Sequence, residues 1–359
     1  MRRFFCNLLL SFILSTMSLP SLAHPLISVD VETGRILAHN QAFERWYPAS
    51  LTKLMTTYVI FRAMSKGEIL PQQAIVISKH AANTPAVHSG YKAGSVLTLE
   101  TALSILLVKS ANDLAIAISE AFSGSEKAFV QQMNIHARRL GMFGTHFANA
   151  SGLPDPNNYS TARDIALLAV QIRREFPQYA HYFSIPAIDF GDGKKIKRNS
   201  NNLIGRFNGI DGMKTGFICA SGFNLVASAT RNQRTIIAVI LGANNINERE
   251  SIAAQLLDTS FSKKGSPKLT LATLRPYGAK ITQVTDMKQK ICNPKTREIY
   301  ADSYDQQGNV ILTSPLITAL PSFILPLPVR LINKKQTHKI AKKMSQGIPI
   351  PHKRPAYTP

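Results

Sequence analysis

Serine and lysine side chains offer the most evident chemistry in this sequence of 359 residues. Ser50-Leu51-Thr52-Lys53 opens an apolar stretch with helical character, and side chains three residues apart on a helix share one face. A serine hydroxyl becomes a good nucleophile when a base removes its proton. A lysine can be that base when burial or a second cation keeps its amine neutral. Ser50 and Lys53 are therefore candidates for a nucleophile and its base.

The S-x-x-K spacing alone is weak evidence, because the same spacing recurs elsewhere in the chain. Ser89 pairs with Lys92, and Ser260 pairs with Lys263. The first pair lies in a glycine-rich polar stretch and the second at the end of a domain. Neither begins an apolar helix, so we interpret both as chance matches.

Two further motifs strengthen the first one. Ser110-Ala111-Asn112 lies in the break between two apolar stretches, where a polar turn has no evident role in packing. Ser200-Asn201-Asn202 has the same pattern but lies in a polar loop. Lys214-Thr215-Gly216 occurs once and is predicted to begin a strand, where a lysine is also compatible with an ordinary sheet edge. Because these motifs lie far apart in the sequence, three different elements must bring them together.

The apolar periodicity predicts an α+β domain over residues 24–262. Strand patterns occur at both ends of this range, and helical patterns with capping residues lie between them. We therefore expect an antiparallel sheet built from both ends of the domain, with a helical subdomain inserted. The predicted strands are 26–31, 35–38, 223–230 and 235–241, and the predicted helices are 51–64, 99–108, 114–122, 128–140, one from about 161 to 175, and 248–261.

The three motifs together resemble the active-site set of the penicillin-recognising serine enzymes, S-x-x-K, S-x-N and K-T-G. The surrounding residues resemble the low-molecular-mass D-alanyl-D-alanine carboxypeptidases, and the resemblance covers residues 26 to about 260. It implies the serine β-lactamase/transpeptidase-like fold. The segments that carry it are Trp46 to Thr56, Lys109 to Asp113, Thr145 to Leu153, Tyr159 to Asp164, and Asp211 to Gly216.

The resemblance implies three catalytic residues. Ser50 would be the acyl-enzyme nucleophile, Lys53 its general base, and Ser110 a proton relay toward the leaving D-alanine nitrogen. The expected reaction removes the terminal D-alanine from peptidoglycan stem pentapeptides, and β-lactam antibiotics are expected to acylate the same serine. No metal or organic cofactor is implied.

The resemblance also implies substrate-binding residues, which are Asn112, Lys214, Thr215, Gly216 and Phe217. Asn112 would hold a peptide amide, Lys214 would tune Ser110, and Lys214 with Thr215 would meet the terminal carboxylate. The backbone N–H groups of Ser50 and Phe217 would form the oxyanion hole, and the edge of strand 215–217 would pair with an extended peptide. Arg198 is a further candidate for carboxylate binding. The chain departs from the family at Ala111, where glycine is usual, and at Phe217, where a polar residue is frequent.

Three other functions remain as alternatives. One is a serine β-lactamase, but residues 151–164 lack the Glu-x-x-x-Asn that activates water in class A enzymes. Another is a D,D-endopeptidase with the same machinery. The last is a basic envelope-binding protein without activity, which the three intact motifs disfavour.

The formal net charge of +21 is unevenly distributed. Residues 1–23 are predicted to be a signal peptide, with Arg2 and Arg3 before an apolar stretch and Ser21-Leu22-Ala23 as the cleavage site. Residues 263–359 carry 17 of the 42 Lys and Arg but 4 of the 21 Asp and Glu. We predict a basic, proline-rich, partly disordered appendage there, and export to the periplasm makes nucleic acid an unsuitable partner. Peripheral contact with anionic lipid or wall polymer is one expectation, and a solvated tail is the other.

Export also affects whether the cysteines are expected to form a disulfide. Cys219 and Cys292 are the cysteines left after cleavage, and disulfides persist outside the cytoplasm. A bridge between the domain and the appendage and a pair of free thiols both remain open.

Overall fold

The structure is a computed structural model that describes residues 24–85, 87–191 and 196–332. The predicted signal peptide at 1–23 and the basic end of the chain at 333–359 lie outside the described residues. None of the helices in the described part of the chain is long and apolar enough to cross a membrane.

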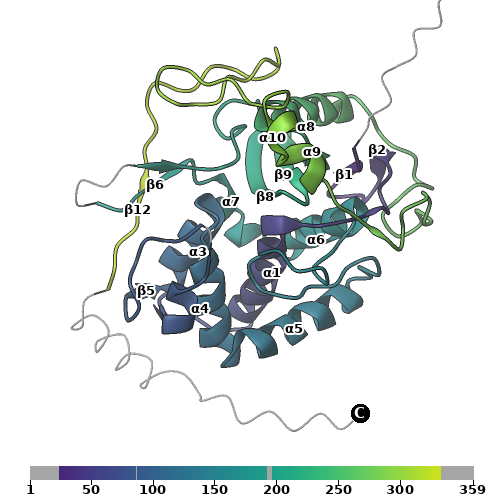
Figure 1. Cartoon of the computed structure of the whole chain (residues 1–359). Helices are drawn as coiled ribbons and strands as arrows, with labels where there is room; N and C mark the ends of the chain where they lie inside the picture. The colour runs from purple at the N-terminus through teal and green to yellow at the C-terminus, as the bar shows by residue number, and fades with distance from the viewer. Residues whose placement is uncertain (1–23, 86, 192–195, 333–359) are drawn as a thin grey trace, which may run out of the picture.

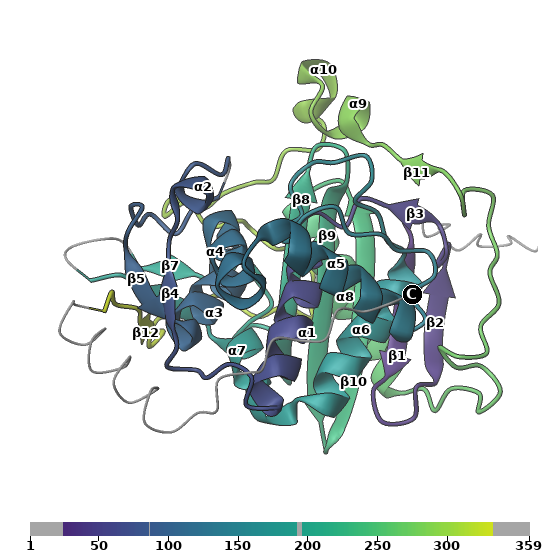
Figure 2. The same cartoon turned by 90° about the horizontal axis from the view of Figure 1, so that it is seen from below.

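The centre of the molecule (Figure 1) is an antiparallel sheet of five strands in the order β2-β1-β10-β9-β8, which can be followed in Figure 2. The strands are β1 (Leu26–Asp30), β2 (Ile36–Asn40), β8 (Ile210–Ile218), β9 (Gly222–Arg231) and β10 (Arg234–Ala243). β1 and β10, the first and the last strand of the predicted domain over residues 24–262, pair with each other. The predicted α+β fold, with a sheet from both ends of the domain, is therefore confirmed, and β8 forms one edge of the sheet.

The β9–β10 hairpin turns at two residues with left-handed backbone conformations, Asn232 (φ 48°) and Gln233 (φ 64°). A two-residue turn of this kind matches the twist of the paired strands. Alternate residues of β10 then point to opposite faces: Ile236 belongs to one apolar cluster and Ile237 to another. Both faces of the sheet are apolar because helices cover both.

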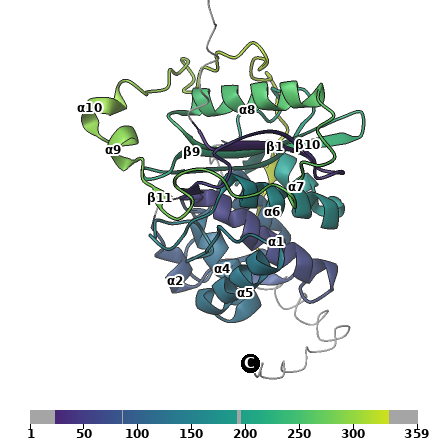
Figure 3. The same cartoon turned by 90° about the vertical axis from the view of Figure 1, so that its right-hand side faces the viewer.

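Helix α8 (Ile246–Phe261) covers one face of the sheet, and the helical block covers the other (Figure 3). In that block α1 is buried on nearly all sides, as its uniform apolar pattern predicts. Side chains cap α3 at Thr98, α5 at Ser125 and α6 at Thr161. The helices of the block are α1 (Thr52–Ser65), α3 (Leu99–Val108), α4 (Asn112–Ser123), α5 (Glu126–Arg139) and α6 (Ala162–Glu175).

Short elements that the sequence patterns did not reveal lie between these. They are β3 (Arg45–Trp46), η1 (Ala49–Leu51), β4 (Ala74–Val76), α2 (Lys79–Ala82), β5 (Val96–Thr98), η2 (Pro177–Tyr179), α7 (His181–Ser184), β6 (Ala187–Asp189) and β7 (Lys197–Arg198). Each has two to four residues, which is too short for a periodic pattern to be visible.

Residues 263–332, hereafter the C-terminal segment, contain only short elements and lie against the rest of the described chain. Its strand β11 (Val284–Thr285) pairs with β3 (Figure 2), and its strand β12 (Leu327–Pro328) pairs with β6. The short helices α9 (Lys288–Ile291) and α10 (Pro294–Arg297) lie between them. Cys292 forms a disulfide with Cys219, next to the end of β8, so the first of the two alternatives for the cysteines is the one observed.

Candidate active site

Ser50 lies in the 3-10 turn η1, directly before α1. The preceding Ala49 has a left-handed backbone (φ 48°), and the loop at Gly152 passes close to it. A Cβ on Gly152 would lie 1.8 Å from the Ala49 carbonyl oxygen, so only glycine allows this approach. The packing of this loop therefore supports the turn that presents the serine.

Lys53 faces Ser50 from the first turn of α1, as the S-x-x-K spacing predicts. Its Nζ lies 3.1 Å from Ser50 Oγ, 2.7 Å from Asn112 Oδ1 and 2.5 Å from the Ser151 carbonyl oxygen. The side chain is fully buried. Burial, and after it the charge of Lys214, holds the pKa of Lys53 well below 10.5, although Asp113 acts in the opposite direction. A neutral amine can accept the proton of the serine hydroxyl.

The second motif lies at the junction of α3 and α4. Ser110 adopts a left-handed backbone (φ 64°) between the two helices, and Asn112 begins α4. The Asn112 side chain is directed inward: it accepts from Lys53 and donates through Nδ2 to the Pro85 carbonyl oxygen at 3.2 Å. Ser110 lines the open cavity, whereas Asn112 lies behind Lys53.

The third motif lies within β8. The strand begins at Ile210, so the expectation that Lys214 begins it is wrong by four residues. Gly216 is the point of closest approach to the serine, because a Cβ there would lie 2.8 Å from the Pro48 carbonyl oxygen and 3.1 Å from Ser50 N. Glycine therefore allows the edge strand to pack directly against η1, which carries the candidate nucleophile Ser50 and is hereafter called the nucleophile turn.

Lys214 is buried beside this contact, and its Nζ donates to the Thr215 carbonyl oxygen at 3.0 Å. Burial, with the nearby Arg249 guanidinium, lowers the pKa of Lys214 from 10.5 to about 7. Two lysines in one dry site, each with a lowered pKa, match the expectation that a second cation helps to keep the first one neutral.

The motifs meet at a cavity of about 660 Å³. Its walls come from the nucleophile turn, the α3–α4 junction, the edge of β8, β7, α8 and the C-terminal segment. Among the lining residues are Ser50, Ser110, Arg198, Ser200, Thr215, Gly216, Phe217, Phe223, Arg249, Asn309 and Val310. Of the eight predicted site residues, the cavity exposes Ser50, Ser110, Thr215, Gly216 and Phe217, and the other three lie beneath it.

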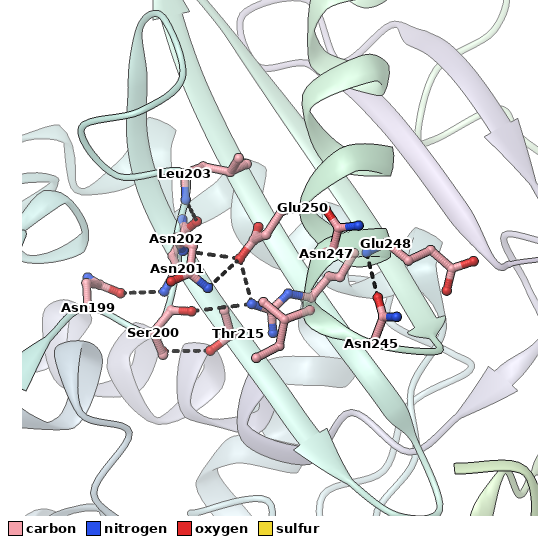
Figure 4. A network of polar contacts seen from close by, with 12 residues as sticks. Asn199, Ser200, Asn201, Asn202, Leu203, Thr215, Asn245, Asn247, Glu248 and Glu250 are labelled. Carbon is pink, nitrogen blue, oxygen red and sulfur yellow. Dashed lines mark hydrogen bonds and ion pairs between the residues drawn. The ribbon is translucent and has the colours of Figure 1, made fainter. Parts of the chain in front are cut away.

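Two polar residues of the cavity were not predicted as site residues. The Ser200 hydroxyl lies 2.7 Å from the Thr215 hydroxyl (Figure 4). Arg249 is buried and donates to Glu250 Oε1 at 2.6 Å and to the Ser200 carbonyl oxygen at 3.3 Å. The S-x-N pattern at Ser200 could have indicated that this residue lines the cavity. No sequence signal indicates Arg249, because it resembles any charged residue of a surface helix.

The two chance S-x-x-K matches have structural roles. The Ser89 hydroxyl donates to the Asp113 carboxylate, and the Ser260 hydroxyl donates to Ser28 Oγ at 2.8 Å. In the described residues, no group of three His, Cys, Asp or Glu side chains is placed to hold a metal ion.

The fold and the site place the Ser50 hydroxyl beside the buried amine of Lys53, which is the arrangement expected of a serine hydrolase with a lysine base. A family model described as D-alanyl-D-alanine carboxypeptidase matches residues 16–245, which is more than half of the chain. The chain belongs to this family.

Curated relatives support the same family assignment. The chain is 33% identical to D-alanyl-D-alanine carboxypeptidase DacF of Bacillus subtilis over 66% of this chain and 61% of that protein. It is 34% identical to DacD of Escherichia coli over 64% of this chain and 61% of that protein. The chain thus spans about three fifths of the length of these relatives.

Solved structures agree as well. The D-alanyl-D-alanine carboxypeptidase DacD from Francisella tularensis matches with a TM-score of 0.65 and 30% identity, covering 67% of this chain and 71% of that one. Penicillin-binding protein D2 from Listeria monocytogenes, solved in its ampicillin-bound form, matches with a TM-score of 0.60 and 27% identity over 66% of this chain and 96% of that one. The predicted β-lactamase/transpeptidase-like fold is therefore confirmed.

Proposed function

We propose that this protein is a serine D-alanyl-D-alanine carboxypeptidase that removes the terminal D-alanine from peptidoglycan stem pentapeptides through an acyl-enzyme. Family membership supports the reaction class. The contact of 3.1 Å between Lys53 Nζ and Ser50 Oγ, at the floor of a cavity beside a strand edge, carries the mechanism.

In acylation, neutral Lys53 takes the proton of Ser50, and Oγ attacks the carbonyl carbon of the peptide bond between the two D-alanines. The backbone N–H groups of Ser50 and Phe217 receive the oxyanion, because the close packing at Gly216 brings both to the same spot. The C–N bond then breaks. Ser110 delivers its proton to the leaving nitrogen and takes the proton held by Lys53 in return, so Lys53 is neutral again when free D-alanine departs.

In deacylation, a water molecule attacks the ester on Ser50 while Lys53 accepts the water proton. The ester bond breaks, the proton returns to Ser50 Oγ, and the shortened peptide leaves. Asn112 acts mainly by orienting Lys53, since its side chain already bonds Lys53 and the Pro85 carbonyl oxygen. One N–H of Nδ2 and one lone pair of Oδ1 remain for contact with a substrate amide, as the family resemblance implies.

The terminal carboxylate of the peptide has a cationic end of the cavity to bind. Thr215 presents its hydroxyl there, Arg198 lines the wall from β7, and Arg249 is buried next to Ser200. A carboxylate gains charge-assisted hydrogen bonds from such groups. The Arg198 side chain is exposed and its guanidinium has no hydrogen-bond or ion-pair partner among the described residues, so it is available to the substrate.

We also propose that the protein works in the periplasm after export and that β-lactams acylate Ser50. The disulfide between Cys219 and Cys292 supports an oxidising compartment.

For the basic end of the chain we propose peripheral contact with anionic lipid or wall polymer. A chain ending at residue 332 keeps the described structure, and it should move from the membrane fraction to the soluble fraction; an unchanged distribution refutes the contact.

Labelling with a fluorescent penicillin tests the assignment. The mature protein should be labelled, Ser50→Ala should not, and Ser262→Ala, at the exposed end of α8, should be labelled like the native chain. Persistent labelling of Ser50→Ala rules out the proposed nucleophile.

Product analysis separates the possible reactions. The protein should release D-alanine from a stem pentapeptide faster than it hydrolyses a penicillin or cleaves a crosslinked dimer. Rapid penicillin turnover without release of D-alanine would instead assign a β-lactamase.

A further inference from the structure

A second cavity of about 450 Å³ lies directly beside the first one. The side chains of Phe217 and Phe223 line both cavities, and their ring centroids are 4.3 Å apart. Phe217 follows the K-T-G motif, so the second cavity continues the cleft along the edge of β8. Phe217 is 44% exposed, and its side chain lies at the boundary between the two cavities.

The C-terminal segment builds the other wall of the second cavity. Its lining residues there are Ile291, Cys292, Arg297, Tyr300, Ala301, Asp302 and Tyr304. The disulfide from Cys292 to Cys219 holds this wall next to the end of β8. Asp302 holds it to the first turn of α8, where its carboxylate accepts from Ile246 N at 3.0 Å and Asn247 N at 2.8 Å.

The same segment then returns to the first cavity. Residues 303–311 form a tight hairpin in which Asp305 accepts from the backbone N–H groups of Gln307 and Asn309. Asn309 and Val310 of this hairpin line the first cavity, hereafter called the catalytic cavity because it exposes the proposed nucleophile Ser50. Beyond the hairpin, Thr313 N donates to Asn247 Oδ1 at 2.9 Å. The wall is therefore held on both sides by α8 and is a built part of the cleft.

The cationic side chains of the catalytic cavity determine the direction in which a peptide binds along β8. The cations of the catalytic cavity gather near Ser200 and Thr215, where the terminal carboxylate binds in the proposed reaction. An extended peptide advances about 3.3 Å per residue along a strand. The residue immediately before the scissile bond therefore lies at Gly216 and Phe217, and the next residue toward the N-terminus, the third of the stem, reaches the second cavity.

The second cavity suits an anionic side chain. Arg297 lines it and is exposed to solvent, and its guanidinium has no hydrogen-bond or ion-pair partner among the residues that the structure describes. Tyr300 and Tyr304 add phenol groups to the same wall, and Tyr304 is 58% exposed. Lys290 lies over the Tyr300 ring, 5.4 Å from its centroid, and adds positive charge nearby. Asp302 lines the same cavity, but its carboxylate accepts from the first turn of α8 and forms no ion pair with Arg297.

We propose that the second cavity is a subsite for the third residue of the stem peptide and that Arg297 selects a side chain with a free carboxylate. This inference rests on the proposed carboxypeptidase function. It gives the C-terminal segment, which lies outside the three motifs, a role in substrate choice. Phe217 supplies an apolar floor between the reacting residue and this subsite.

Two pentapeptides that differ at one group test the proposal. Both carry diaminopimelate at the third position, one with its side-chain carboxylate free and one with that carboxylate amidated. The native enzyme should have a higher kcat/KM for the free carboxylate, by about fivefold, the size of one exposed ion pair. In Arg297→Ala the ratio should fall to near one, and Arg297→Lys should restore part of it.

Lys295→Ala is the matched control, because Lys295 lies on the same short helix but lines neither cavity. It should keep the native ratio. A native ratio near one, or an unchanged ratio in Arg297→Ala, overturns the proposal. If the native protein releases D-alanine from neither peptide and binds no fluorescent penicillin, the proposed function itself is wrong.

Discussion

The two walls of the cleft are built in different ways. The wall that carries the proposed catalytic residues, here called the catalytic wall, consists of the nucleophile turn, α1 and β8, and its two lysines are buried in the core of the domain. The opposite wall is the C-terminal segment, which has only short elements and largely exposed side chains. Packing positions the first wall, whereas a disulfide, a helix cap and a few hydrogen bonds position the second. Changes to the first wall should therefore affect chemistry, and changes to the second should affect substrate choice.

Lys53→Met should have the largest effect on the catalytic wall. It keeps the volume of the side chain but removes the base at 3.1 Å from Ser50 Oγ. Loss of a general base lowers rates by about 10²–10⁴-fold. The rate of acylation by a penicillin measures this, and Lys92→Met, in the exposed chance match, should acylate normally. Equal acylation by both variants would contradict the proposed base.

Gly216→Ala should have the next largest effect. The added Cβ would lie 2.8 Å from the Pro48 carbonyl oxygen and push β8 away from the nucleophile turn. Displacing reacting groups by about 1 Å can cost roughly 100-fold in rate. The loss should appear in kcat/KM for D-alanine release.

Gly67→Ala is the control for that variant. Gly67 also has a left-handed backbone (φ +70°), but a Cβ there meets nothing within 4 Å. It should lower the free energy of unfolding by about 1–2 kcal/mol through backbone strain, with native activity. If both variants lose activity alike, the close approach at Gly216 is not the cause.

Lys214→Met should change the pH dependence of acylation. With its pKa near 7, Lys214 is charged in acid, where its charge helps to lower the pKa of Lys53. Removing that charge raises the pKa of Lys53, so the acidic limb of the rate profile should move to higher pH. Lys214→Arg keeps a cation and should leave the limb closer to its native position. A limb that moves to lower pH would contradict this coupling.

Removing the disulfide should have the smallest effect on the chemistry. In a chain with Cys219→Ser and Cys292→Ser, the C-terminal segment loses a covalent link across 73 residues. The free energy of unfolding should fall by about 2–4 kcal/mol, measured by denaturant unfolding of the oxidised protein. Penicillin acylation should remain close to native, while the preference for the free carboxylate should weaken. A large loss of acylation would mean that the two walls are not separable.

Much of the fold and of the catalytic set follows from the sequence. Capping residues such as Thr98 and Thr161 predict where helices begin, and two runs rich in β-branched residues on either side of 231–234 predict the hairpin. These patterns are local, because each depends on residues within one or two turns of the chain. The S-x-x-K, S-x-N and K-T-G motifs predict the catalytic residues for the same reason: each lies within a few residues of one element.

Other features depend on contacts between distant segments. Arg249 of α8 affects the pKa of Lys214 of β8 because the fold brings these two elements close together. Ser200 meets Thr215 because the loop before β8 lies against that strand (Figure 4). Asn112 turns toward Lys53 because burial requires partners for both side chains. No local pattern contains this information, since these pairs are separated by between 15 and 59 residues in the chain.

The sequence by itself determined which residues are the candidates for the chemistry and which elements hold them, because motif spacing and apolar periodicity are local properties. The tertiary structure alone decided that Lys53 and Lys214 share one dry site and that Gly216 meets the nucleophile turn. It also decided that residues 291–310 close the cleft. The physical reason is that burial and the closure of a cavity arise only when both faces of the sheet are packed and the C-terminal segment is fastened across its edge.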